Sequence, residues 1–410
     1  MFHFILADLA RNRIGVVVLI ILVALATALG VTVTLQERAL RLGSARAAAP
    51  FDLVIGAPGS ETQLVLSSVF LQPAPLPLVS PEVLAGLRAD PRVEAAVPVG
   101  FGDFVESNPI IGTTADAVAM FGGLTEGTAF DHLGDAVAGA EVKRTVGSTF
   151  RPFHGNAGDV GEVHAQVQYR IVGRLARTGT PWDRAILVPI QAVWDTHAAH
   201  HHAADEMAAH QHGHEDDFAA RPVDNALLDG DANPGVPAIV IKPKSISDAY
   251  NLRQQYRGDT TLAVFPGEVL TRLYGTLGDA RRVLSLVATG AQALVAAAIL
   301  MVIATHVLQR RRQIGALRAF GAPRAVVLSI VWLETFALLA VGLLTGFAIG
   351  YGATHALSQR LGEASGVAMP VELNVSDAWM LAAFLIAAAL VTFLPAFIAY
   401  RQTPAQALRS

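Results

Sequence analysis

The sequence predicts a membrane protein with four transmembrane helices and a mixed α/β domain inserted between the first and the second helix. Of its 410 residues, 52% are hydrophobic and only 16% are charged, which is too apolar for an ordinary soluble protein of this length. Four apolar runs each reach the length of about 20 residues that a helix needs to cross a bilayer. A polar segment large enough for a packed core separates the first run from the other three.

Each predicted part follows from these runs. In chain order the parts are an amphipathic helix on the inner membrane surface (1–13), the first transmembrane helix (14–35), an α/β domain (36–282), the second transmembrane helix (283–308), a basic loop (309–325), the third transmembrane helix (326–352), a short outer loop (353–377), the fourth transmembrane helix (378–400) and a tail (401–410). The start also fits a cleaved signal peptide with an Ala-x-Ala site at residues 26–28. The length of its apolar run favours a retained helix.

The arginines predict the orientation, because cytoplasmic flanks carry the Lys and Arg excess. Arginines cluster before the first helix, between the second and third, and after the fourth, whereas the loop between the third and fourth helices offers only Arg360. We therefore expect both termini in the cytoplasm and the large domain outside, which means the periplasm if the membrane is a bacterial inner membrane.

Composition and motifs exclude several classes of function. The net charge of −4 argues against nucleic-acid binding, and the lack of cysteine excludes disulfides and thiolate metal sites. Neither a phosphate-binding Gly-x-x-x-x-Gly-Lys-Ser/Thr loop nor a Gly-x-Ser-x-Gly nucleophile elbow occurs. We expect no catalytic residue and no cofactor in this chain apart from a metal ion discussed below.

The α/β domain is predicted from alternating and continuous apolar runs. Strands are expected at 51–57, 93–105, 169–176, 185–190 and 238–243, and helices at 81–90 and 245–256. Residues 267–282 are expected to form a helical stalk that leads into the second transmembrane helix.

A histidine-rich insert, residues 196–217, holds seven of the thirteen histidines. Its candidate metal ligands are His197, His200, His201, His202, Asp205, Glu206, His210, His212 and His214. Alanine spacing favours a helix to about residue 209, which would place His197, His201 and Asp205 on one face. Imidazole and carboxylate suit zinc. A dynamic multi-site sensor or buffer, a single closed zinc site, and a solvated insert without a metal role all remain open.

Gly342, Gly346 and Gly350 repeat at four-residue spacing in the third transmembrane helix, so another helix can approach closely there. That helix belongs either to the same chain or to a second copy. Glu334 in the same helix suggests a structural or interfacial carboxylate rather than a functional one.

The loop contains "RRRQIGALRAFGAP", and residues 309–319 are predicted to form a short basic amphipathic helix. Gly321 supplies its C-terminal stop and Pro323 the start of the next helix. Two interpretations fit this pattern: a helix held by anionic membrane lipid, or a docking surface for a soluble partner. With the terminal "AYRQTPAQALR", this loop resembles the ABC transporter permease family that includes MacB, FtsX, LolC and LolE. The stretches "FDLVIGAPGSETQLVLSSVF", "IIGTTAD" and "TGTPWDRAILVP" resemble a less characterised branch of these permeases.

The resemblance implies that residues 310–322 are a coupling helix that docks into a separate ATPase, which binds ATP and Mg. The implied coupling residues are Arg310, Arg311, Arg312, Gln313, Ile314, Gly315, Leu317, Arg318 and Gly321. Relatives usually have Glu where this chain has Gln313, so an ion pair there would be replaced by a hydrogen bond. The family precedent of a permease homodimer favours glycine packing between two copies.

Three functions remain open. The first is an ABC permease that exports or extracts an envelope substrate such as a lipid, lipoprotein or peptide, under zinc control. The second is an FtsX-like scaffold that does not transport and activates a periplasmic partner or carrier protein. The third is a metal-ion transport component, which the scarcity of polar groups in the transmembrane helices disfavours.

Overall fold

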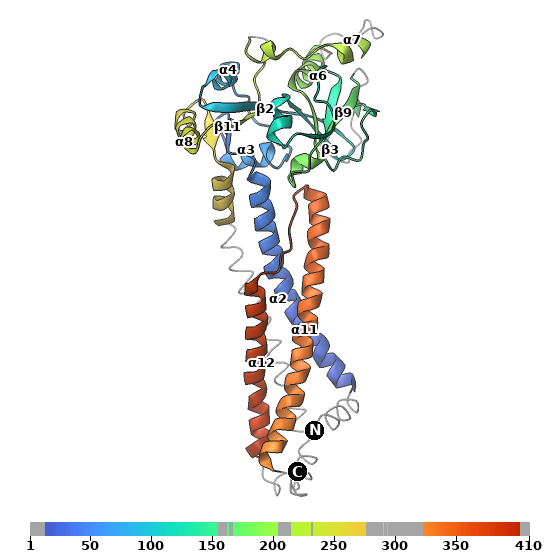
Figure 1. Ribbon diagram of the computed structural model, residues 1–410, viewed down its shortest axis with the longest axis vertical. Helices are drawn as coiled ribbons and strands as arrows, with labels where there is room; N and C mark the ends of the chain where they lie inside the picture. Colours follow the sequence, from blue (N-terminus) through green and yellow to red (C-terminus); the bar gives the residue numbers. More distant parts are fainter. Residues whose placement is uncertain are drawn as a thin grey trace. The chain divides into compact units, whose positions relative to one another are not determined.

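The computed structural model describes residues 13–154, 162–163, 167–203, 215–230, 233–275, 290, 293 and 323–401. The chain divides into two compact units (Figure 1). The helical unit comprises residues 1–40, 277–360 and 370–410, and the sheet unit comprises residues 41–276 and 361–369. Most of the predicted α/β domain, residues 36–282, falls in the sheet unit, to which the segment 361–369 also belongs.

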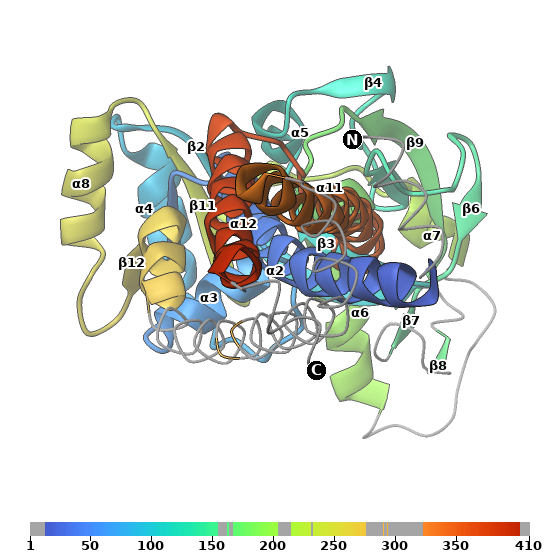
Figure 2. The same ribbon diagram turned by 90° about the horizontal axis from the view of Figure 1, so that it is seen from below.

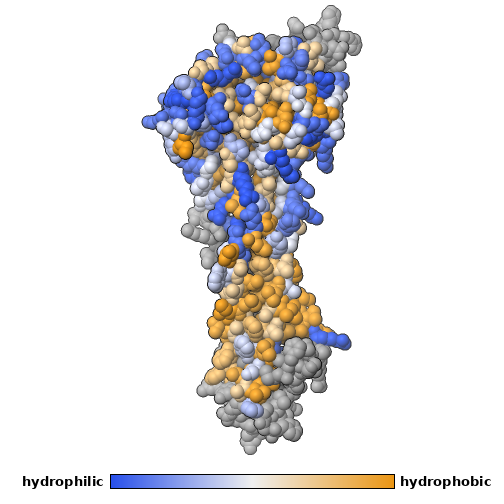
Figure 3. Space-filling model, viewed as in Figure 1, coloured by the Kyte–Doolittle hydropathy of each residue, from blue (hydrophilic) through white to orange (hydrophobic). Residues whose placement is uncertain are grey.

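The described part of the helical unit consists of three long helices, α2 (Arg13–Ala48), α11 (Arg324–Ser365) and α12 (Val375–Arg401). Each contains a span that is long and apolar enough to cross a membrane. Large apolar side chains such as Ile14, Ile386 and Leu390 are exposed on them, and hydrophobic residues cover much of their surface in Figure 3. Three of the four predicted spans are therefore found, whereas the span 283–308 lies outside the described residues except for positions 290 and 293.

The helices are longer than the predicted spans. Helix α11 has 42 residues and is about 63 Å long at 1.5 Å per residue, roughly twice the thickness of a bilayer core. The predicted loop 353–377 is therefore wrong in its first half, because residues 353–365 are helical. Hydropathy detects only the part of a helix that lies in lipid. The true end is Gly366, which adopts φ +72° and donates its N–H to the carbonyl of Gly362.

The sheet unit is built on one mixed sheet with the strand order β12-β1-β11-β2-β3-β10-β5-β9-β4. These strands are β1 (Leu53–Gly56), β2 (Val93–Val105), β3 (Asn108–Thr113), β4 (Leu124–Gly127), β5 (Asp135–Ala138), β9 (Tyr169–Leu175), β10 (Ile186–Pro189), β11 (Ala238–Pro243) and β12 (Leu262–Val264). Short strands β6 (Thr149–Phe150), β7 (Phe153–His154) and β8 (Glu162–Val163) pair beside this path. Two neighbouring pairs are parallel, β3 with β10 and β5 with β9.

Short helices cover the sheet. They are α3 (Glu61–Ser68), α4 (Pro81–Ala89), α5 (Asp116–Met120), α6 (Ile190–Ala203), α7 (Glu215–Ala220) and α8 (Ile246–Gln255), with 3₁₀ turns η1 (Pro181–Arg184) and η2 (Asn225–Leu228). Residues 266–275 are also helical and form the described part of the predicted stalk. Helices α4 and α8 lie at the β12 end of the sheet, and β4 and β9 form the other end (Figure 2).

The mixed α/β class and all five predicted strands are confirmed. The long run 93–105 becomes β2 over its full predicted length, and the predicted helices 81–90 and 245–256 become α4 and α8. Both helices begin directly after a serine, and the Ser245 side chain accepts a hydrogen bond from the Asp248 N–H. A buried aromatic cluster marks one core region: the Phe51, Phe121 and Trp182 ring centroids lie 4.5–6.0 Å apart.

Candidate functional site

The glycine stripe of α11 lies against α2 of the same chain. A methyl group built on Gly346 would come within 2.5 Å of the Ala24 carbonyl oxygen, and similar groups on Gly342 and Gly350 would collide with α2 at 2.7–2.8 Å. Backbones approach so closely only where side chains are absent. Helix α2 therefore occupies this face, and a second copy cannot pack against the same stripe. A homodimer, if formed, needs another surface.

A bidentate ion pair joins α2 to the start of α12. The Arg38 guanidinium donates to both carboxylate oxygens of Asp377 at 2.7 and 2.9 Å. The Asn374 N–H donates to the same carboxylate at 2.7 Å, and Asp377 is almost fully buried. Such fork geometry fixes orientation as well as distance. Trp332 of α11 adds a bond to α12 by donating from Nε1 to the Ala389 carbonyl. Glu334 of α11 is buried among these helices.

The "TGTPWD" stretch of the sequence forms a rigid turn in the sheet unit. The buried Asp183 carboxylate accepts hydrogen bonds from the Thr178 N–H and hydroxyl, both at 2.8 Å, and from the Gly179 N–H at 2.7 Å. The turn continues into η1, whose Trp182 is fully buried in the aromatic cluster. A buried carboxylate with three donors strongly favours this one backbone conformation.

The segment that follows α11 packs against this turn. The Ala368 N–H donates to the Gly179 carbonyl at 3.4 Å, and a methyl group on Gly366 would lie 3.1 Å from Pro181 Cα. On another side the segment meets the last turns of α2, because a methyl group on Gly43 would lie 2.6 Å from the Ala368 carbonyl oxygen. We call this contact of Gly43, residues 366–369 and the turn 178–183 the junction.

The described stalk, residues 266–275, is fixed to the same end of α2. The Tyr274 hydroxyl donates to Ser44 Oγ at 2.6 Å. Two ion pairs connect the stalk to neighbouring helices. Glu268 pairs with Arg253 of α8 at 2.7 Å, and Arg272 pairs with Glu61 of α3 at 2.8 Å. Within the sheet unit, the three segments that lead to the helical unit therefore meet at residues 43 and 44.

The remaining predicted site residues fall largely outside the described part of the chain. This is the case for all nine coupling residues between Arg310 and Gly321, and for Asp205, Glu206, His210, His212 and His214. The backbone of His197, His200, His201 and His202 lies in α6, which is described as far as Ala203, and the remainder of the helix expected to about residue 209 lies outside the described residues. Helical geometry puts His197 and His201 one turn apart. Among the described residues, no three His, Asp or Glu side chains form a metal site.

Sequence reasoning missed the junction. Its members are small or ordinary residues, and their importance depends on contacts between segments that lie far apart in the chain. The available signals were Gly43 and Gly366, each next to the end of a long helix. The "TGTPWD" stretch offers a further signal, because its Asp and Thr spacing is typical of a side-chain-capped turn.

Comparisons with known proteins support the prediction of a membrane permease. Residues 285–405 match a family model described as FtsX-like permease C-terminal. Among curated proteins, none matches the chain. Two solved structures are similar to about half of this chain. The periplasmic region of MacB from Actinobacillus actinomycetemcomitans has 8% identity and a TM-score of 0.32, with 55% of this chain and 95% of that chain covered. The extracellular domain of the noncanonic ABC-type transporter YknZ from Gram-positive bacteria has 11% identity and a TM-score of 0.27, with 52% and 98% covered.

These TM-scores are too low to support an argument about the inserted domain. The family match covers the third and fourth predicted transmembrane helices, the basic loop before them and most of the second. The resemblance to FtsX-like permeases is thereby confirmed over residues 285–405, which match the C-terminal region of that family.

Proposed function

We propose that this chain is the permease subunit of an ABC transporter that passes the stroke of a separate ATPase to the sheet unit. The ATPase binds ATP and Mg, and residues 310–322 form the helix that docks into it. The family match over residues 285–405 supports this proposal, because it includes the basic loop. The bacterial inner membrane, with the sheet unit in the periplasm, is the location that the arginine distribution favours.

The observation that carries the proposal is the meeting of three segments at residues 43 and 44. The segment after α11 contacts the end of α2 through Ala368 and Gly43, and the stalk contacts the same end through Tyr274 and Ser44. A packed contact of this kind transmits displacement, because close-packed side chains and backbones cannot be compressed. A movement that begins in the basic loop would reach the sheet unit along the stalk on one side and along α11 on the other.

The output of this movement is the export or extraction of an envelope substrate, with a lipid, lipoprotein or peptide as the candidate classes. The alternative is a scaffold that does not transport and activates a periplasmic partner. The junction supports both functions equally, since each needs a sheet unit that responds to ATP. The proposal also includes that the permease forms a homodimer and that the histidine-rich insert responds to zinc.

The lack of cysteine allows a direct test with a single introduced label. We would place Thr271→Cys on the exposed side of the stalk, attach an environment-sensitive fluorophore, and reconstitute the chain with its ATPase in lipid nanodiscs. ATP should change the emission of the fluorophore. Leu317→Glu, which puts a charge on the apolar face of the predicted coupling helix, should abolish both this change and the stimulation of ATP hydrolysis.

The matched control is Leu361→Glu, an equal change on α11 in the part assigned to the sheet unit. It should leave ATP hydrolysis intact. If the complex that contains the Leu317→Glu chain hydrolyses ATP, and its fluorophore changes emission, as in the complex with the parent chain, then residues 310–322 are not the coupling helix and the proposal fails.

A further inference from the structure

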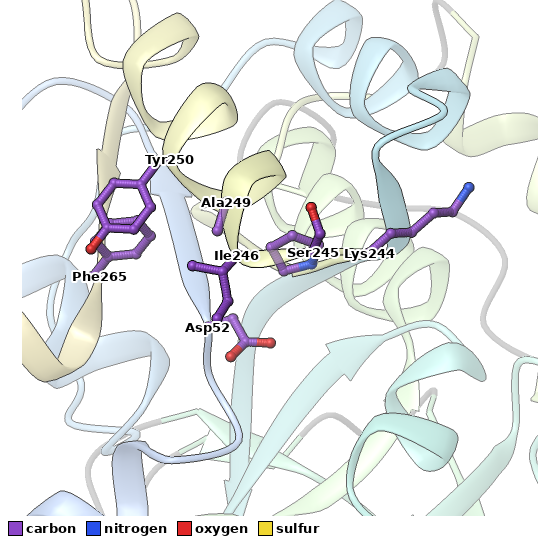
Figure 4. Close-up of a pocket in the computed structure, with 8 residues that line it drawn as sticks. Asp52, Lys244, Ser245, Ile246, Ala249, Tyr250 and Phe265 are labelled. Carbon is purple, nitrogen blue, oxygen red and sulfur yellow. The ribbon is translucent and has the colours of Figure 1, made fainter.

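A hollow of about 370 Å³ opens on the sheet unit at the start of α8. Its walls come from the end of β11, the first turns of α8, the residue before β1 and the residue after β12 (Figure 4). The side chains that define it are Asp52, Lys244, Ser245, Ile246, Tyr250 and Phe265. We call it the Asp52 pocket. No part of the proposed coupling path uses it.

Asp52 supplies the negative charge of the pocket, and Lys244, which also lines it, supplies a positive one. Among the described residues it makes no hydrogen bond and no ion pair, whereas the lysines near it are already engaged. Lys242 pairs with Glu94 at 3.0 Å, and Lys244 donates to the Pro91 carbonyl at 2.6 Å. Partial burial raises the pKa of Asp52, although Lys242 acts in the opposite direction. The Asp52 residue is exposed, so its carboxylate is accessible to an approaching cation and attracts it electrostatically.

Apolar side chains surround this charge. Ile246 is 80% exposed and Tyr250 is 61% exposed, although both are large and lie together on the first turn and a half of α8. The Tyr250 and Phe265 rings meet edge to face with centroids 5.1 Å apart, and the Arg253 guanidinium covers Phe265 at 4.7 Å. In Figure 4 the two rings form one wall while the Asp52 carboxylate lies below Ile246. The aromatic wall is thus held in place before any ligand arrives.

This pattern matches a cation on an aliphatic stem. Lysine and arginine bury a chain of methylenes against apolar surface while their charged heads pair with a carboxylate. Aromatic faces also attract such cations. A free ammonium ion or a small amine would leave Ile246 and Tyr250 uncovered, whereas a side chain carried on a polypeptide covers them with its neighbours.

We propose that the Asp52 pocket binds a lysine or arginine side chain of a partner polypeptide. The pocket is built where the chain enters and leaves the sheet unit: Asp52 follows the end of α2 by four residues, and Phe265 directly precedes the stalk. A bound side chain therefore contacts both segments at once. Occupancy of the pocket and movement of the stalk are then linked, and each biases the other.

The test is a titration of the full chain in nanodiscs with isotope-labelled isoleucine methyl groups. The Ile246 signal, assigned with Ile246→Val, reports on the pocket. The probe is the peptide acetyl-Ala-Lys-Ala-amide, and its norleucine counterpart has a similar stem without the charge. We expect a saturable shift of the Ile246 methyl with the lysine peptide, and binding weaker by about tenfold or more for Asp52→Asn.

Two variants keep the result interpretable. Asp259→Asn makes the same chemical change at an exposed position and should bind like the parent chain. Ile246→Ser removes an exposed apolar wall without touching the core, and should weaken binding when followed through other isoleucine signals. No shift with the lysine peptide, an equal shift with the norleucine peptide, or unchanged binding by Asp52→Asn would each overturn the proposal. None of these readouts requires the ATPase.

Discussion

Single residues without side chains decide how closely the segments of this chain approach. Gly346 lets α11 touch the backbone of α2, and Gly43 does the same for α2 and the segment after α11. Gly366 serves differently, because its φ of +72° is a conformation that residues with a Cβ rarely adopt. Each of these glycines therefore has one physical task, which can be removed with a single methyl group.

Gly346→Ala tests this at the α2–α11 contact. The added methyl group would meet the Ala24 carbonyl and the Thr27 side chain, and backbone atoms cannot move aside as a flexible side chain can. We expect a loss of about 1–3 kcal/mol in stability, seen as a lower melting temperature of the chain in nanodiscs. Gly352→Ala is the control on the same helix, where a methyl group meets nothing within 4 Å. Equal melting temperatures for the two variants would contradict the close packing.

At the scale of elements, the sequence predicted the strands better than the ends of the long helices. Strands β2 and β11 are bounded by prolines, glycines and charges that interrupt their apolar runs, so their limits are visible locally. Strands β5 and β12 were not predicted; they have four and three residues and pair with neighbouring strands. Helices α2 and α11 continue well beyond their apolar spans, and hydropathy does not detect a helix in water.

The candidate sites also differ in how far the sequence could predict them. The glycine stripe was visible as a spacing, but only the fold shows that α2 occupies it. The Arg38–Asp377 pair and the junction join residues hundreds of positions apart, and nothing in a local window marks them. The Asp52 pocket likewise depends on three separate segments coming together, residues 52, 243–250 and 265.

The histidine-rich insert carries a prediction about metal binding. Helix α6 brings His197 and His201 one turn apart, a spacing at which two imidazoles can share an ion. We expect the full chain in nanodiscs to bind zinc in a competition assay with a chromogenic chelator, and to lose this binding when the seven histidines of the insert become asparagine. His132→Asn with His355→Asn is the control outside the insert, and it should bind zinc like the parent chain. If the insert variant still binds zinc equally well, the histidines are not the ligands.

For the whole molecule, the proposed function depends on which side of the membrane each part faces. A stroke that starts at the basic loop and ends in the sheet unit requires the two to lie on opposite sides. The arginine excess predicts the loop and both termini inside, because cytoplasmic flanks retain positive charge during insertion. Since the chain has no cysteine, every label reports on one introduced site.

Asp259→Cys in the sheet unit and Ser410→Cys in the predicted tail should therefore react differently with a membrane-impermeant maleimide. In intact cells with a permeabilised outer membrane, the cysteine at position 259 should be labelled and the cysteine at position 410 should not. After lysis both should react, which shows that each thiol is accessible. Labelling at position 410 before lysis would place the tail outside and reverse the direction of the proposed stroke. Equal labelling of both positions in intact cells would mean that the termini and the sheet unit share one side, and transmission across the membrane could then not be the task of this chain.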